Sequence, residues 1–191
     1  MALPPLVLAG FGVTHPVDLT PETAPYWRDL HIVILAVFPL LGFSPWLVLR
    51  GRTLWVSIVA AVLGFVYAAF YTALDVLNGI GAGSEEHAFS MAGGDMDGMN
   101  MAKGTLFGIG SDLGRIGSWA FIAAAAFATV VAIRRWNWWA ALPGAVLIVG
   151  AVLFLLRHIY FPVGVVGQLC IAAGWVGMLL VARRAQRTVA S

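Results

Sequence analysis

Five uninterrupted apolar runs, each long enough to cross a lipid bilayer, constrain the fold of this chain more than any other feature. A helix needs about 20 residues to cross a hydrocarbon core of about 30 Å. The runs lie at about 30–49, 53–78, 109–133, 138–157 and 163–182. They are continuous rather than alternating, which favours helices over strands. With 61% hydrophobic and only 10% charged residues, the sequence predicts an all-α integral membrane protein, a bundle of five transmembrane helices.

The charged residues divide between the two ends of this bundle. Seven basic residues and no acidic ones fall on one set of helix ends: Arg50, Arg52, Arg134, Arg135, Arg183, Arg184 and Arg187. Since short cytoplasmic loops carry the excess of Lys and Arg, we expect the N-terminus outside and the C-terminus in the cytoplasm. The predicted parts are an extracytoplasmic segment at 1–29, a membrane domain at 30–183 and a cytoplasmic tail at 184–191. The predicted location is the inner membrane of a bacterium or archaeon.

The first 29 residues have two distinct stretches. Residues 3–13 are apolar but too short to span a bilayer, and they lack the positive flank of a secretory signal. We therefore expect an interfacial or re-entrant piece, with a signal segment as the alternative. Three prolines, Pro16, Pro21 and Pro25, follow within ten residues. They predict an irregular segment over the outer mouth of the bundle.

Ionisable residues from four predicted helices fall at one depth. At a rise of about 1.5 Å per residue, each lies roughly 28–34 Å from the cytoplasmic end of its helix. They are His31, Asp75, Asp112, Arg115 and His158, with Arg157 beside the last. Residues near a helix end also reach water simply by extending their side chains. Convergence of four helices favours an outer polar layer instead, in which Asp75 pairs with Arg115 or with His31.

The predicted outer loop at 81–104 is rich in methionine. Met91, Met96, Met99 and Met101 lie close to His87 in a Gly-rich, acidic stretch. Thioether sulfur selects Cu(I), and imidazole accepts either copper oxidation state. The run 95–101, DMDGMNM, resembles the Met-rich segments of bacterial periplasmic copper-resistance proteins. We therefore expect a flexible loop whose sulfurs bind a copper ion, against the alternative of methionines that merely pack onto the membrane surface.

Three classes of function fit these features. The first is a protein that binds or hands over copper, with His31, His87 and His158 assisting the Met-rich loop. The second is a non-catalytic structural or accessory subunit that contacts the bilayer and other membrane subunits. The third is a b-haem electron carrier with His31 and His158 as axial ligands and Arg115 or Arg157 near a propionate. No catalytic signature motif is present, so we do not expect an enzyme. The basic residues flank the membrane, so no nucleic-acid partner is expected.

Overall fold

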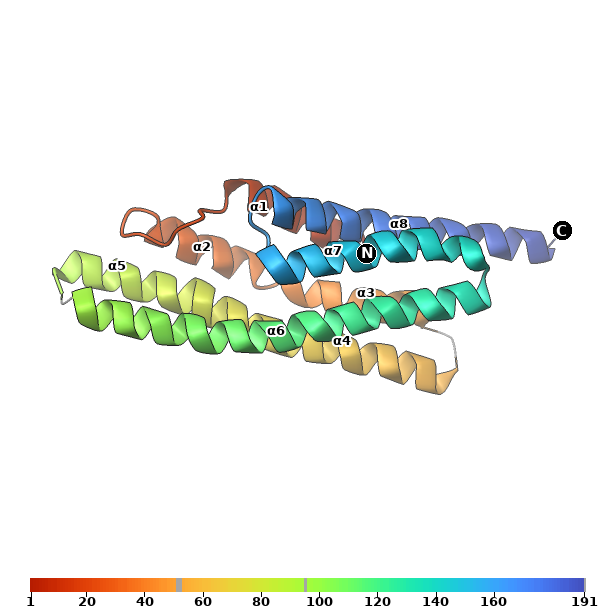
Figure 1. Cartoon of the computed structure of the whole chain (residues 1–191), viewed down its shortest axis with the longest axis horizontal. Coiled ribbons are helices and arrows are strands. Elements are labelled where there is room, and N and C mark those ends of the chain that lie inside the picture. Colours follow the sequence, from red (N-terminus) through yellow and green to blue (C-terminus); the bar gives the residue numbers. More distant parts are fainter. Residues whose placement is uncertain (51–52, 95, 191) are drawn as a thin grey trace.

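The elements of this fold are all helical within the part of the chain that the structure describes. The computed structural model describes residues 1–50, 53–94 and 96–190 (Figure 1). The first helices are α1 (Leu3–Thr14), α2 (Ala24–Ile34), α3 (Phe38–Leu49) and α4 (Leu54–Leu74). A π-helical segment, η1 (Asp75–Gly81), continues α4 into α5 (Ala82–Ala92). The remaining elements are α6 (Met96–Arg135), the short 3₁₀ segment η2 (Trp138–Ala140), α7 (Ala141–Arg157) and α8 (Val163–Ala190).

Within the described residues, five helical stretches are long and apolar enough to cross a membrane, which confirms the predicted number. They are Ala24–Leu49, Leu54–Ala92, Asp97–Arg135, Trp138–Arg157 and Val163–Arg187. Large apolar side chains such as Leu54, Phe65 and Leu142 point out of the bundle and are more than two-thirds exposed. Apolar surface of this kind suits contact with lipid. The fold is therefore that expected of a multi-pass helical membrane protein.

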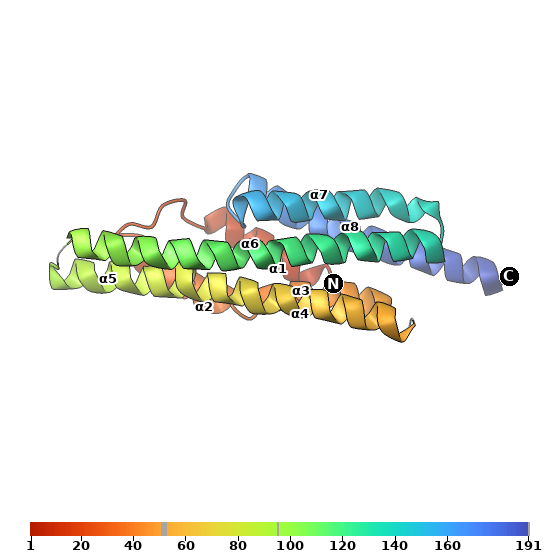
Figure 2. The same ribbon diagram turned by 60° about the horizontal axis from the view of Figure 1, so that its bottom comes forward.

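The predicted flexible loop at 81–104 is helical, so that expectation was wrong. The chain continues through η1 into α5, turns at Gly93 with a φ of 61°, and starts α6 at Met96. Lys103 donates to Glu86 across the two helices at 2.6 Å, and Glu86 is only 2% exposed. Although glycines are frequent here, the Ala, Glu, Met and Lys residues between them favour helix. The result is a helical hairpin tip at one end of the molecule (Figures 1 and 2).

The N-terminal helix packs within the bundle rather than beside it. Helix α1 contacts α8, Leu8 is fully buried, and Gly12 lies against the backbone of Ile159. In both views the chain begins about halfway along the bundle (Figures 1 and 2). The 12 residues of α1 are too few to cross a bilayer. The irregular segment predicted after it is present at 15–23 and leads back to α2.

Glycines let the helices approach closely enough for backbone contact. Gly42 of α3 and Gly64 of α4 face each other so closely that a Cβ on either would collide with the other's carbonyl. Gly150 and Gly167 have a similar role between α7 and α8. Since lipid supplies no hydrophobic force between helices, such close van der Waals contact is what holds the bundle together. Fully buried residues in the interior include Ile34, Phe38, Tyr67, Phe121, Leu147, Phe154 and Trp175.

Candidate metal centre

Three of the four histidines meet beside the connection between α7 and α8. His15 follows α1, His31 lies on α2, and His158 directly follows α7. One ring nitrogen from each residue lies within 4.8 Å of the others. His15 and His31 are buried, whereas His158 keeps some exposed surface although its Nε2 is buried. The fold thus brings three imidazoles from distant parts of the chain into one cluster, named here the histidine cluster.

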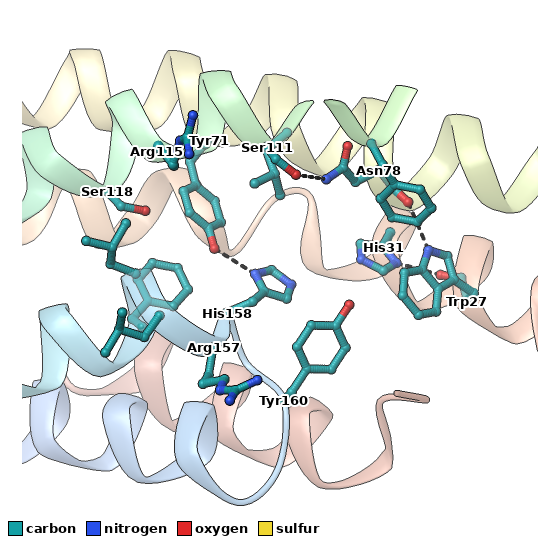
Figure 3. A pocket seen from close by; sticks show the side chains of 16 residues that line it. Trp27, His31, Tyr71, Asn78, Ser111, Arg115, Ser118, Arg157, His158 and Tyr160 are labelled. Atoms are coloured by element: carbon teal, nitrogen blue, oxygen red, sulfur yellow. Dashed lines mark hydrogen bonds between the residues drawn. The ribbon is translucent and has the colours of Figure 1, made fainter. Parts of the chain in front are cut away.

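Each histidine of the cluster has its Nδ1 engaged by a neighbouring oxygen. His15 Nδ1 lies 2.7 Å from the carbonyl of Pro16, and His31 Nδ1 lies 2.7 Å from the carbonyl of Trp27. His158 Nδ1 lies 2.6 Å from the hydroxyl of Tyr71 (Figure 3). A carbonyl only accepts, so His15 and His31 must donate through Nδ1–H. For His15 and His31 this arrangement is the one that orients metal-binding histidines, because it leaves Nε2 as the ligand atom. His158 has the same tautomer when its Nδ1–H donates to the Tyr71 hydroxyl.

The Nε2 atoms of His15 and His31 are 3.4 Å apart. If both rings are neutral and protonated on Nδ1, two lone pairs face each other with no proton between them. A cation between the nitrogens would remove that conflict. Two imidazoles on one tetrahedral ion, with bonds of about 2.0–2.1 Å, place their nitrogens roughly 3.4 Å apart. The spacing of this pair therefore suits two ligands of a single small metal ion.

Burial favours the neutral forms of His15 and His158. Burial is the main cause that lowers the pKa of His15, partly offset by the hydrogen bond to Pro16. Burial also lowers the pKa of His158 well below its usual value, and the charges of His15 and His31 act in the same direction. Neutral imidazole is the form that binds metals. The environment therefore favours metal ligation over the imidazolium state.

His158 has a strained backbone. Its φ is 48° and its ψ is −131°, a conformation that residues with a side chain rarely adopt. Such strain costs on the order of 1–3 kcal/mol and gathers at functional sites. Here the conformation ends α7 and turns the His158 ring inward, whereas the preceding Arg157 is exposed. This turn brings His158 into the cluster.

Asp75 is a buried carboxylate beside the cluster. It is 0% exposed, and among the described residues neither carboxylate oxygen has a hydrogen-bond partner. Its Oδ1 lies 3.9 Å from His31 Nε2, so the predicted Asp75–His31 pair is close in space but is not hydrogen-bonded. The other pairing was wrong: Arg115 bonds Asp112 at 2.7 Å on the outside of α6, where both side chains are exposed. An unpaired buried carboxylate is costly unless it is protonated or close to a cation.

The π-helical segment explains how Asp75 and His31 come so close. Widening of the helix at η1 leaves the Asn78 carbonyl able to accept the indole N–H of Trp27 at 3.0 Å. Gly79 lies directly against the His31 ring, and a Cβ there would overlap with the imidazole. The Asn78 amide also donates to Ser111 at 3.2 Å, which ties η1 to α6 (Figure 3). Short π-helical segments of this kind are frequent at functional sites.

A cavity of about 340 Å³ adjoins the histidine cluster. His31, His158 and Tyr71 belong to its wall, whereas His15 does not, so His15 closes the far side of the cluster. Apolar residues of α6 and α7 form much of the remaining wall, together with the polar residues Ser111, Ser118, Arg115, Arg157 and Tyr160. Figure 3 shows Arg115 and Arg157 on opposite sides of the His158 ring. The cluster is thus closed on one side and open to a cavity on the other.

The other predicted ligands lie elsewhere. Met91 and Met101 are 77% and 76% exposed at the hairpin tip, whereas Met99 is 1% exposed. The side chain of Met96 lies outside the described residues. His87 lies on α5 and is not part of the histidine cluster. Copper binding by these methionines stays a prediction, but it cannot rest on a flexible loop.

The predicted haem ligands also have a different environment from the one expected. A haem requires an open slot between His31 and His158. Their ring centroids are 6.2 Å apart, but the ring of His15 lies 5.0 Å from one and 5.8 Å from the other. This compact arrangement suits a single ion better than a macrocycle.

Three elements of the site were not found from the sequence. His15 is one of only four histidines, and it lies in the segment expected over the outer mouth. These two facts together could have assigned it to the site. Tyr71 and Gly79 carry no such signal, because one resembles an ordinary core aromatic and the other an ordinary helix-contact glycine. Their roles follow only from the tertiary arrangement.

Comparison with models of protein families, with curated proteins and with solved structures finds no match to this chain. The class that the fold defines is a multi-pass helical membrane protein, and its candidate site is a cluster of three histidines, of which His15 and His31 are buried. The geometry of that cluster is the basis for proposing a function.

Proposed function

We propose that this membrane protein binds a copper ion through the Nε2 atoms of His15, His31 and His158. The observation that carries the proposal is the engagement of all three Nδ1 atoms by oxygens while the three rings converge. Imidazole suits copper, zinc, iron and nickel, and Cu²⁺ binds most tightly among the divalent ions of this series. Copper is the proposed ion on the ground of affinity, and zinc, which prefers the tetrahedral geometry that the 3.4 Å spacing of His15 and His31 suits, is the main competitor.

Asp75 supplies negative charge to this proposed centre. Its carboxylate lies 3.9 Å from His31 Nε2 and has no hydrogen-bond partner among the described residues. A divalent ion among three neutral imidazoles would keep its full charge in an apolar interior, which is unfavourable. One buried carboxylate reduces that net charge, and an oxygen donor favours Cu²⁺ over Cu⁺. Asp75 acts from outside the coordination shell, through a water molecule on the ion, and so leaves one position of the ion open.

The proposed orientation places the histidine cluster on the outer side of a cytoplasmic membrane. It rests on the seven basic residues at the opposite helix ends, four of which are Arg134, Arg135, Arg183 and Arg184. Tags at 94 and 186 in intact cells test the orientation. Labelling of position 94 from outside and of position 186 only after permeabilisation is expected. The reverse pattern would place the cluster on the cytoplasmic side and contradict the proposal.

Copper binding is tested on protein purified without a histidine tag. Equilibrium competition with a chromophoric chelator should give one tightly bound Cu²⁺ per chain. Replacement of His15, His31 or His158 by Ala should each weaken binding about 100-fold or more, because a direct ligand is worth at least as much as the roughly 10–100-fold of its outer-shell partners. His87→Ala, at the hairpin tip, is the matched control and should bind normally. Wild-type protein that binds no transition metal would leave the structural-subunit alternative as the better account.

A further inference from the structure

We infer that the cavity beside the histidine cluster binds an amphiphile with an oxyanion head group, which enters from the bilayer between α6 and α7. The inference rests on the proposed metal centre, because the head group is placed between the metal and Arg157. The volume of the cavity, about 340 Å³, is at the small end of ligand pockets, which span about 300–1,000 Å³. The cavity thus suits a head group and the first part of an acyl chain.

The position of the cavity gives a ligand access to the metal. His31 and His158 belong both to the cluster and to the cavity wall, whereas His15 belongs to the cluster alone. A metal bound by the three Nε2 atoms therefore has its open side toward the cavity. His158 Nε2 has no hydrogen-bond partner among the described residues. Three protein ligands with one open position are the arrangement that lets a metal bind an external oxygen.

The charge at the mouth of the cavity selects an anion. Arg157 is exposed on the wall, and no ion pair joins it to any residue in the described ranges. Arg115, on the opposite side of His158 in Figure 3, is already bonded to Asp112. An unpaired guanidinium binds carboxylate or phosphate through paired hydrogen bonds. Arg157 is therefore the residue that would hold the oxyanion.

The apolar part of the wall selects a ligand from the membrane. Leu74, Phe107, Phe154 and Leu155 line the cavity, and Leu156 on its wall is mostly exposed on the outside of α7. A free inorganic anion would find little that is favourable along these side chains, whereas an alkyl chain would bury apolar surface. Amphiphiles also reach a side entrance of this kind directly from the lipid phase.

The test uses the full chain loaded with Cu²⁺ in a neutral detergent, with dodecanoate and dodecyl phosphate as probes. Acetate and inorganic phosphate are the matched free anions. Coordination of the head group should change the Cu²⁺ electron paramagnetic resonance spectrum saturably at one probe per chain. R157Q should weaken the alkyl probes about tenfold or more, because charged hydrogen bonds are lost. R183Q, at the opposite end of the bundle, makes the same charge change and should bind like wild type.

Each result decides between the two proposals. If copper binds but its spectrum does not change with either alkyl probe, the cavity inference is wrong and the proposed metal centre is unaffected. Equal binding of acetate and dodecanoate would also overturn the cavity inference, because the ligand would be a free anion. Equal weakening by R157Q and R183Q would overturn it too, because the net positive charge of the protein alone would then attract the probes. If the chain binds no copper, calorimetry of the metal-free protein decides. Dodecanoate binding in wild type that is lost in R157Q would support the cavity inference. No dodecanoate binding in wild type would overturn it.

Discussion

The hairpin tip and the histidine cluster lie toward the same end of the molecule but differ in nearly every physical respect. At the tip, Met91 and Met101 are exposed, and the Glu86–Lys103 ion pair joins the two helices. In the cluster, His15 and His31 are buried and their Nδ1 atoms are held by backbone carbonyls. The tip offers soft sulfur ligands without a fixed arrangement, whereas the cluster offers oriented nitrogens. Preorganisation therefore favours the cluster as the tight metal site.

The two regions also differ in how visible they are in the sequence. A high local density of methionine is visible in the sequence, but in helices α5 and α6 these side chains point in different directions, with Met99 inward and Met101 outward. The three histidines are 16 and 127 positions apart in the chain and become neighbours only in the folded bundle. A cluster of the second kind carries no local sequence signal.

The largest expected effect contrasts these two regions directly. H31A should reduce Cu²⁺ affinity about 100-fold or more, because it removes a ligand whose position the fold has fixed. Replacing Met91, Met96, Met99 and Met101 together by Leu keeps the bulk of the side chains and should change Cu²⁺ affinity less than about threefold. Competition titrations of both variants measure the difference. A larger loss in the methionine variant would reverse the comparison and return the tight site to the tip.

Asp75→Asn should affect binding and stability in opposite directions. Copper affinity should fall about 10–100-fold, because the centre loses a charged neighbour. The metal-free protein should become as stable as wild type or more so, because an uncompensated carboxylate no longer has to be buried. Chelator competition and thermal unfolding in detergent measure the two effects. If the variant lost stability and kept its copper affinity, Asp75 would have a structural role only.

A smaller effect should follow from G79A, which acts on the cluster through shape alone. The added Cβ would overlap with the His31 ring, so the imidazole must move away from His15. We expect roughly tenfold weaker copper binding, since small displacements of a ligand cost part of its contribution. The control is G108A in α6, where a Cβ meets no atom within 4 Å. It should keep full affinity and gain up to about 1 kcal/mol of helix stability. Identical affinity in both variants would show that the position of His31 does not matter.

The smallest effect on copper is expected from Lys103→Gln at the hairpin tip. The change removes the partner of Glu86, which is only 2% exposed, and should destabilise the hairpin by about 1–2 kcal/mol. Copper affinity should stay within about twofold of wild type, because the ion pair does not contact the cluster. Hydrogen exchange of the backbone at 82–105 and a copper titration test the two statements. A strong loss of copper binding would show that the two regions are coupled.

The sequence predicted most of the fold and part of the site. The five membrane spans follow from long apolar runs, and the alignment of His31, Asp75 and His158 at one depth follows from the helical rise alone. Depth along a helix does not determine the direction of a side chain, which explains why Asp75 was also matched with Arg115. The helical tip was missed because its glycines suggested a loop. The π-helical shift at η1 was missed because it depends on contacts with α2 and α6.

X-ray absorption spectroscopy of the copper-loaded, untagged protein tests the central claim most directly, because nitrogen and sulfur ligands scatter differently. The histidine cluster predicts a first shell of nitrogen and oxygen atoms at about 2.0 Å, with the outer scattering of imidazole rings and no sulfur shell near about 2.3 Å. The same spectrum should be unchanged in the quadruple methionine variant and lost in H15A. A sulfur shell in wild type that disappears in the methionine variant would contradict the account and place the copper at the hairpin tip.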